Sequence, residues 1–137
     1  MAEPTRSYFA AITDIAENCL NKIRFKRIDV NADRSVWEVH GNLSECFDVR
    51  LKEIFTQKGR MYSYYILCEN EVVIGFDNYP DTRLLQEKYG SKFVNHIAEL
   101  IPHRHGRRKM SIELTENMSV KSFFEYLTAT DDWKKSG

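Results

Sequence analysis

Apolar residues near the amino terminus recur at intervals of three and four positions. They are Tyr8, Ile12, Ile15, Cys19, Leu20 and Ile23. This spacing lines up apolar side chains along one side of a helix and is typical of an amphipathic helix that packs on a core. Pro4 and Thr5 suit the first positions of such a helix. The pattern predicts a helix from about Thr5 to Ile23.

In the middle of the chain the apolar period changes to two. Apolar residues alternate with polar ones from Val36 to His40 and again from Phe47 to Lys52, which is typical of strands with one face in water. The run Met61–Cys68 is apolar or aromatic on both faces, and Val72–Phe76 follows it after a short polar turn. Two such runs so close together favour a hairpin. Because sequential strands usually pair with their neighbours, we predict an antiparallel meander.

The last third of the chain returns to a longer apolar period. Leu85, Tyr89, Phe93, Ile97 and Leu100 predict a second helix that ends near Pro102. Met110, Ile112 and Leu114 alternate with polar residues and predict one more strand. Ser119 is a suitable cap for a short third helix that carries Val120, Phe123, Phe124 and Leu127. From about residue 129 the chain is polar apart from Trp133, and we expect this tail to fray.

These elements predict one α+β domain over residues 1–137. An antiparallel β-meander sheet would be packed by the amino-terminal helix, the middle helix and the short carboxy-terminal helix. The composition, with 42% hydrophobic and 29% charged residues, is that of a soluble globular domain. No window of eighteen apolar residues and no basic leader occurs, so we expect no membrane contact and a cytoplasmic location.

Charge and cysteine content narrow the range of functions. Twenty basic residues balance twenty acidic ones, so nucleic-acid binding would have to be local rather than driven by a global positive field. The three cysteines, Cys19, Cys46 and Cys68, are widely spaced and form no CxxC pair. We expect free thiols in a reducing compartment.

Candidate chemistry is concentrated in the nine residues from Ile101 to Lys109. This segment holds His103 and His105, two of the four histidines, and four cations, namely Arg104, Arg107, Arg108 and Lys109. Imidazole can accept a proton, donate one or bind a metal. Guanidinium groups offer paired donors that suit phosphate. The segment therefore predicts an acid–base centre, a metal site or an anion-binding loop.

Asp77 is the candidate partner of these histidines. Asp77 and Asn78 end one predicted strand, and the His-x-His pair lies just before another. If the two strands are neighbours, the Asp77 carboxylate can orient an imidazole and stabilise its protonated form. The alternative is an ordinary turn, in which the side chains of Asp77 and Asn78 bond to their own backbone.

Three interpretations of the His-x-His pair stay open at this point. On a strand both imidazoles face one side, so His103 and His105 could bind a metal with Asp77 or His96. The acid–base interpretation needs no metal or cofactor: the imidazoles move protons at a ribose hydroxyl and a leaving oxygen, and the neighbouring cations stabilise the phosphorane. The third is a solvated basic loop. Tyr64 similarly suits either base stacking or core packing.

Three segments carry a resemblance to a known family. Tyr62–Tyr65, Val73–Pro80 and Pro102–His105 together resemble the TumE family of small toxin components from prokaryotic toxin–antitoxin modules. The chain differs from the family pattern in the helical segment between the second and third motifs, and in Pro102, where the family often has a further histidine. The resemblance implies growth inhibition that a cognate antitoxin neutralises. It supplies no reaction.

We therefore predict a cytoplasmic toxin that acts as an endoribonuclease without a metal ion. His103 and His105 are the predicted proton-transfer residues, and Asp77 is the orienting carboxylate. The predicted RNA contacts are Arg104, Arg107, Arg108, Lys109 and Tyr64. The alternative function is a non-catalytic module that binds nucleic acid or protein through the His–Arg segment.

Overall fold

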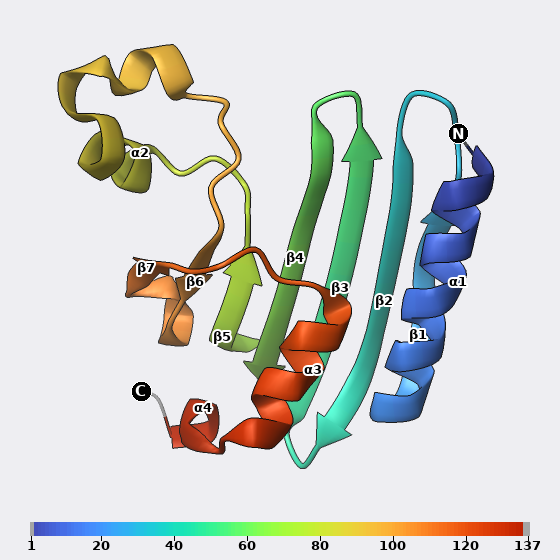
Figure 1. The fold of residues 1–137 in the computed structure, drawn as a ribbon. Helices are drawn as coiled ribbons and strands as arrows, with labels where there is room; N and C mark the ends of the chain where they lie inside the picture. The colour runs from blue at the N-terminus through green and yellow to red at the C-terminus, as the bar shows by residue number, and fades with distance from the viewer. Residues whose placement is uncertain (1, 136–137) are drawn as a thin grey trace.

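The computed structural model describes residues 2–135 and contains a seven-stranded antiparallel sheet in which each strand pairs with the next (Figure 1). The elements in chain order are α1 (Ala2–Cys19), β1 (Asn21–Asp29), β2 (Ser35–Ser44), β3 (Phe47–Thr56), β4 (Gly59–Cys68), β5 (Glu71–Asp77), α2 (Thr82–Tyr89), the 3₁₀ helix η1 (Gly90–His96), β6 (His103–His105), the 3₁₀ helix η2 (Arg107–Lys109), β7 (Ile112–Leu114), α3 (Val120–Ala129) and α4 (Asp132–Lys135). The predicted α+β meander is confirmed.

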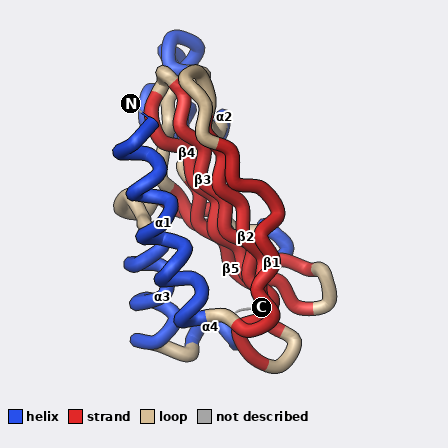
Figure 2. The backbone as a smooth tube through the Cα atoms, turned by 90° about the vertical axis from the view of Figure 1, so that its right-hand side faces the viewer, coloured by secondary structure: helices blue, strands red, loops and turns tan. Residues whose placement is uncertain are grey.

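Helices α1 and α3 lie on the same face of the sheet (Figures 1 and 2). Alternation along the strands turns a row of apolar and aromatic side chains towards them, including Val39, Leu51, Tyr64 and Phe76, all buried. The helices contribute buried side chains such as Ile12 of α1 and those of Val120, Phe123 and Leu127 of α3. Burial of this apolar surface is the main force that holds α1 and α3 on the sheet.

The predicted hairpin between the third and fourth runs is confirmed. Glu69 and Asn70 join β4 to β5, with φ of 53° and 67° respectively. Positive φ at both central residues is the signature of a two-residue turn whose twist matches the flanking strands. The turn pairs Cys68 with Glu71 and Leu67 with Val72, and a register shift between Leu67 and Ile66 then sets Tyr64 opposite Phe76 and Tyr65 opposite Gly75.

The first helix is shorter than predicted, because the chain from Asn21 forms a strand. α1 ends at Cys19, and β1 then pairs with β2. The residues of β1 are mostly exposed, so their apolar periodicity carried little information about the strand. Pairing with β1 gives hydrogen-bond partners to backbone groups of β2 that would otherwise lack them. This stabilisation outweighs the helical preference that the sequence pattern around Ile23 indicated.

The middle helix is divided and packs away from the main core. α2 ends at Gly90, whose φ of 61° suits glycine at a helix terminus, and η1 follows. Leu84 and Leu85 of α2 form a small separate cluster with Ile101. Figure 1 shows this unit beyond the end of β5, beside the sheet rather than on its face.

The carboxy-terminal tail does not fray at Trp133, contrary to the prediction. The Trp133 side chain is 2% exposed, its ring meets Phe47 edge-on at 5.0 Å, and its Nε1 donates to the Leu127 carbonyl at 3.3 Å. Burial of one large aromatic ring is sufficient to hold α4 against the sheet. Residues 136 and 137 lie outside the described part of the chain.

The prediction of three free thiols is wrong. Cys46 and Cys68 form a disulfide, whereas Cys19 is free and exposed. The two bonded residues are 22 positions apart, and only the register that pairs Phe47 with Cys68 brings them together. Within residues 2–135, no helix is long and apolar enough to cross a membrane.

Replacing both bonded cysteines, as Cys46→Ala with Cys68→Ala, is expected to lower the free energy of unfolding by about 2–4 kcal/mol, because the bond restricts the unfolded chain. Urea denaturation of the unreduced proteins measures this loss. Cys19→Ala is the matched control and should leave stability nearly unchanged, because its side chain closes no loop. Titration of three free thiols in denatured, unreduced wild-type protein would contradict the disulfide.

Candidate functional site

Two rows of side chains cross the face of the sheet opposite α1 and α3, which we call the open face. The first row is Arg24, His40, Arg50, Tyr65, Gly75 and His105, and the second is Arg27, Glu38, Lys52, Ser63, Asp77 and His103. Each residue in a row is the direct cross-strand partner of the next. Because alternate residues point to opposite faces, both rows share the open face. Polar residues from six strands therefore lie on one surface.

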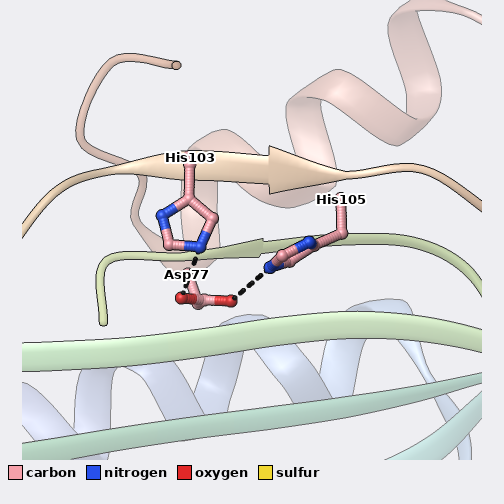
Figure 3. A group of neighbouring side chains, drawn as sticks. All are labelled: Asp77, His103 and His105. Atoms are coloured by element: carbon pink, nitrogen blue, oxygen red, sulfur yellow. Dashed lines mark ion pairs between the residues drawn. The ribbon is translucent and has the colours of Figure 1, made fainter. Parts of the chain in front are cut away.

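The rows end at β6, where both histidines converge on Asp77 (Figure 3). The Nε2 of His103 lies 3.1 Å from Oδ1 of Asp77, and the Nε2 of His105 lies 3.5 Å from Oδ2. We predicted this contact only if the two strands that carry these residues are neighbours. They are β5 and β6, and they pair Asp77 with His103. The His-x-His pair is itself a strand, so the segment is not the basic loop that its composition suggested.

His103 is held as a charged, buried ring. Its Nδ1 lies 2.6 Å from the Ile101 carbonyl, so both ring nitrogens face acceptors and a doubly protonated ring satisfies both. Burial opposes the charge, but the hydrogen bonds to Asp77 and Ile101 outweigh it and raise the pKa of His103 above its ordinary value. The residue is 1% exposed. These contacts favour a positioning role for His103, although the ring also lines the cavity at the site, and its predicted proton-transfer role stays a prediction.

The Asp77 carboxylate accepts four hydrogen-bond contacts. Besides the two imidazoles, the Tyr65 hydroxyl donates to it at 2.7 Å and the Tyr79 amide at 3.0 Å. Burial alone would raise the pKa of Asp77, but the bonds from His103, His105 and Tyr65 outweigh it and hold the pKa well below the usual range. The hydrogen bond from the Tyr79 backbone amide is the predicted turn interaction, and the hydrogen bonds from the imidazoles are the predicted orienting interaction. Both predicted roles of Asp77 therefore occur together.

Tyr65 is a site residue that the sequence analysis did not select. Its ring lies over Gly75, where a Cβ would come within 2.1 Å of Cε2, so only glycine leaves room for it. Burial and the bond to Asp77 raise the pKa of the Tyr65 hydroxyl far above its ordinary value, so it stays a donor. The usable signal was the alternation, which places Tyr65 on the same face as Asp77.

Tyr64, which was predicted to contact RNA, is fully buried on the helix face. Its exposed fraction is 0%, and its hydroxyl donates to the buried carboxylate of Glu53. Alternation turns neighbouring strand residues to opposite faces, so Tyr64 belongs to the core and Tyr65 to the site. The predicted stacking role of Tyr64 is wrong for this reason.

The four predicted cations separate in space. Lys109 comes to the site, with Nζ 4.8 Å from the centroid of the Tyr65 ring. Arg108 instead pairs with Glu71 at 3.2 Å. Arg104 pairs with Glu113 on the opposite face of the sheet from the imidazoles, which corrects its predicted place at the site. Arg107 begins η2 and is partly exposed.

Two adjoining cavities hollow the open face. One of about 340 Å³ contains the Asp77 site, and one of about 270 Å³ extends to Arg50 and Glu38. Lys52, Ser63, Tyr65 and Lys109 line both, so we call the combined cavity the open-face trough. His105 lines it with a side chain that is 13% exposed. The Nδ1 of His105 is buried and has no hydrogen-bond partner among the described residues.

The same three residues have the donor set of a metal site. One ligand atom from each of Asp77, His103 and His105 lies within 4.8 Å of the others. Two imidazoles and a carboxylate suit zinc or another first-row divalent ion, and a carbonyl bonded to the far nitrogen is the usual support for a ligating histidine. His96, the other suggested ligand, is outside this group: it contacts Glu99 at 3.2 Å and stacks on Tyr89.

No protein-family model, no curated protein and no solved structure matched the chain. The resemblance to the TumE family stays a prediction.

Gly75→Ala is expected to displace the Tyr65 ring and to lower the free energy of unfolding by about 1–3 kcal/mol, because the added methyl overlaps the ring. In a Tyr65→Ala background the same change should cost less, since the overlapping atoms are gone. Urea denaturation of the four proteins gives the coupling energy between the two sites. Equal costs of Gly75→Ala in both backgrounds would contradict the close contact.

The Asp77–His103 pair should make stability depend on pH. The pKa of His103 is raised on folding, so its contribution is present below the unfolded pKa of about 6.5 and is lost as pH rises through the folded pKa. Asp77→Asn should cost about 3 kcal/mol near pH 6, and less at pH 9. Urea denaturation of metal-free protein measures this loss, with the exposed Asp33→Asn as control. A loss that grows with rising pH would contradict the charged pair.

Proposed function

We propose that this chain is the toxin component of a toxin–antitoxin module and inhibits growth by cleaving RNA without a metal ion. The observation that carries the proposal is the Asp77 carboxylate, bonded by two imidazoles and a phenol at one end of a trough lined by Lys52 and Lys109. An oriented imidazole beside ammonium groups is suited to phosphodiester chemistry.

His105 is the proposed proton-transfer residue. Its ring lines the trough, and its Nε2 faces Asp77, which stabilises the ring when it becomes positively charged. Unlike His103, His105 lacks a second protein acceptor among the described residues, because its Nδ1 has no partner. Only one nitrogen of the His105 ring therefore faces a protein acceptor, so the protein does not hold this ring with both nitrogens hydrogen-bonded.

In the proposed reaction, the Nδ1 of His105, the nitrogen that does not face Asp77, takes the proton of a ribose 2′-hydroxyl. Because Nδ1 is buried, this step requires the ring to turn towards the trough when the substrate binds. The 2′ oxygen forms a bond to phosphorus, and the bond from phosphorus to the 5′ oxygen breaks. The leaving oxygen takes a proton from solvent in the open trough. The products are a 2′,3′-cyclic phosphate and a 5′-hydroxyl end, and the ammonium groups of Lys52 and Lys109 stabilise the negative charge that develops at phosphorus.

A second candidate is a metal-dependent hydrolase at the same residues. The convergence of one carboxylate and two imidazoles, with the Ile101 carbonyl behind His103, favours it. A bound divalent ion would supply an activated water and polarise the substrate. The two candidates differ in their response to a chelator.

The test is cleavage of single-stranded RNA by purified protein, with and without EDTA. We expect cleavage in both conditions and cyclic phosphate ends, and His105→Ala should lower the rate by about 10²–10⁴-fold, the contribution of general acid–base catalysis. Arg104→Ala is the control, because Arg104 lies on the other face. Activity lost in EDTA and restored by zinc would favour the metal-dependent candidate. No cleavage of several RNAs in either condition would overturn both.

The toxin role is tested separately in living cells. Expression of the wild-type chain in a bacterium should inhibit growth, and His105→Ala should relieve the inhibition at equal protein level. Co-expression of a short neighbouring reading frame should restore growth if it encodes the antitoxin. Equal inhibition by wild type and His105→Ala would instead favour a non-catalytic binding function.

A further inference from the structure

Several cations of the open face lie beyond the site that the proposed reaction uses. Arg24 of β1 and Arg50 of β3 belong to the same cross-strand row as His105. Adjacent strands are about 4.8 Å apart, so Arg50, three strands from β6, lies about 14 Å from the His105 position, and Arg24 lies about 24 Å away. Neither side chain can reach the reacting phosphate. Their position calls for another explanation.

The charges of this surface are unbalanced although the whole chain is neutral. Arg24, Arg50, Lys52 and Lys109 form no ion pair with a carboxylate in the described part of the chain, which covers residues 2–135. Of the two carboxylates in the rows, Asp77 is bonded to both imidazoles and Glu38 bonds to His40 at 3.0 Å. The rows also hold four arginine and lysine side chains, Arg24, Arg27, Arg50 and Lys52, so this surface carries more cations than acids.

The trough links Arg50 and Lys52 to the site. Its two cavities share Lys52, Ser63, Tyr65 and Lys109, and their linings extend from Asp77 to Arg50. Tyr79, Pro80 and Lys109 are among the residues that line the trough near the site. A single strand can bend to follow these cavities, whereas the backbone of a duplex is fixed in the A form, so we commit to single-stranded RNA.

We propose that the open face binds single-stranded RNA across the strands, with one phosphodiester at His105, the following phosphates along the trough at Lys52 and Arg50, and a further phosphate beyond the trough at Arg24. The proposal rests on the proposed function for the identity of the reacting residue. The backbone is recognised by charge, which is the sequence-independent part of nucleic-acid binding. The Tyr65 ring already carries Lys109 on its face, so stacking on this ring is not part of the recognition.

The test measures binding apart from cleavage. His105→Ala protein is titrated with a fluorescent single-stranded RNA that carries 2′-O-methyl groups and cannot be cleaved. Adding Arg50→Ala or Arg24→Ala should weaken binding roughly threefold to tenfold and should reduce the slope of affinity against salt by about one per removed contact. Lys121→Ala is the matched control, because Lys121 is an exposed cation of α3 on the helix face. It should change neither quantity.

In the cleavage-competent protein, Arg50→Ala should raise KM and leave kcat nearly unchanged, because its contact is the same before and during the reaction. Affinities equal to that of Lys121→Ala would overturn the RNA path even if the chain cleaves RNA. Binding that depends on Arg50 and Arg24 without any cleavage would overturn the proposed function and leave the path standing. Equal affinity for double-stranded RNA, or for polyglutamate as an acidic peptide, would overturn the commitment to single-stranded RNA.

Discussion

The candidate site depends on the pairing of β5 with β6. This ladder contains three residue pairs, and it sets Asp77 opposite His103 and Gly75 opposite His105. A shift of one residue would turn both imidazoles to the helix face and bring Arg104 to the carboxylate, since side chains alternate with a period of two. Two further contacts secure the register: the Ile101 amide donates to the Asn78 carbonyl at 3.0 Å, and Ile101 is buried with Leu84 and Leu85. The α2 unit therefore acts as a folded connection that returns the chain to the sheet in one register.

The two faces of the sheet hold polar clusters of different kinds. On the helix face, Glu53 is fully buried and accepts bonds from Tyr8, Tyr64 and Arg60, which tie α1 to β3 and β4. Arg60 also donates to the Met118 carbonyl ahead of α3. A buried carboxylate with every partner supplied specifies one arrangement of the core, and it has no access to a ligand. The Asp77 cluster instead opens into a trough, so its titratable groups lie beside space for a substrate.

Sequence patterns located much of this arrangement. Alternation identified β2 and β3, and two apolar runs around a short polar turn identified β4, β5 and the hairpin at Glu69 and Asn70. Helical spacing identified α1 and α3, because each of these helices buries one side against the core. Asp77, His103 and His105 were selected as a group and do meet. The errors have two causes. The strand β1 and the disulfide depend on which strands pair and in which register, and pairing is a contact between distant segments. The exchange of Tyr64 for Tyr65 and the turning away of Arg104 follow from alternation within one strand, which the choice of site residues did not apply.

The sequence by itself therefore determined the types of most elements, the chemistry that is available and the two short segments that hold it. Local periodicity encodes which side of an element is apolar, and this information is complete within a few residues. The tertiary structure alone decided that His103 is sealed between Asp77 and Ile101 while His105 faces the trough, and that cations from β1, β3 and η2 share one surface with them. Those outcomes depend on the cross-strand register, which is set by the folding of the whole sheet.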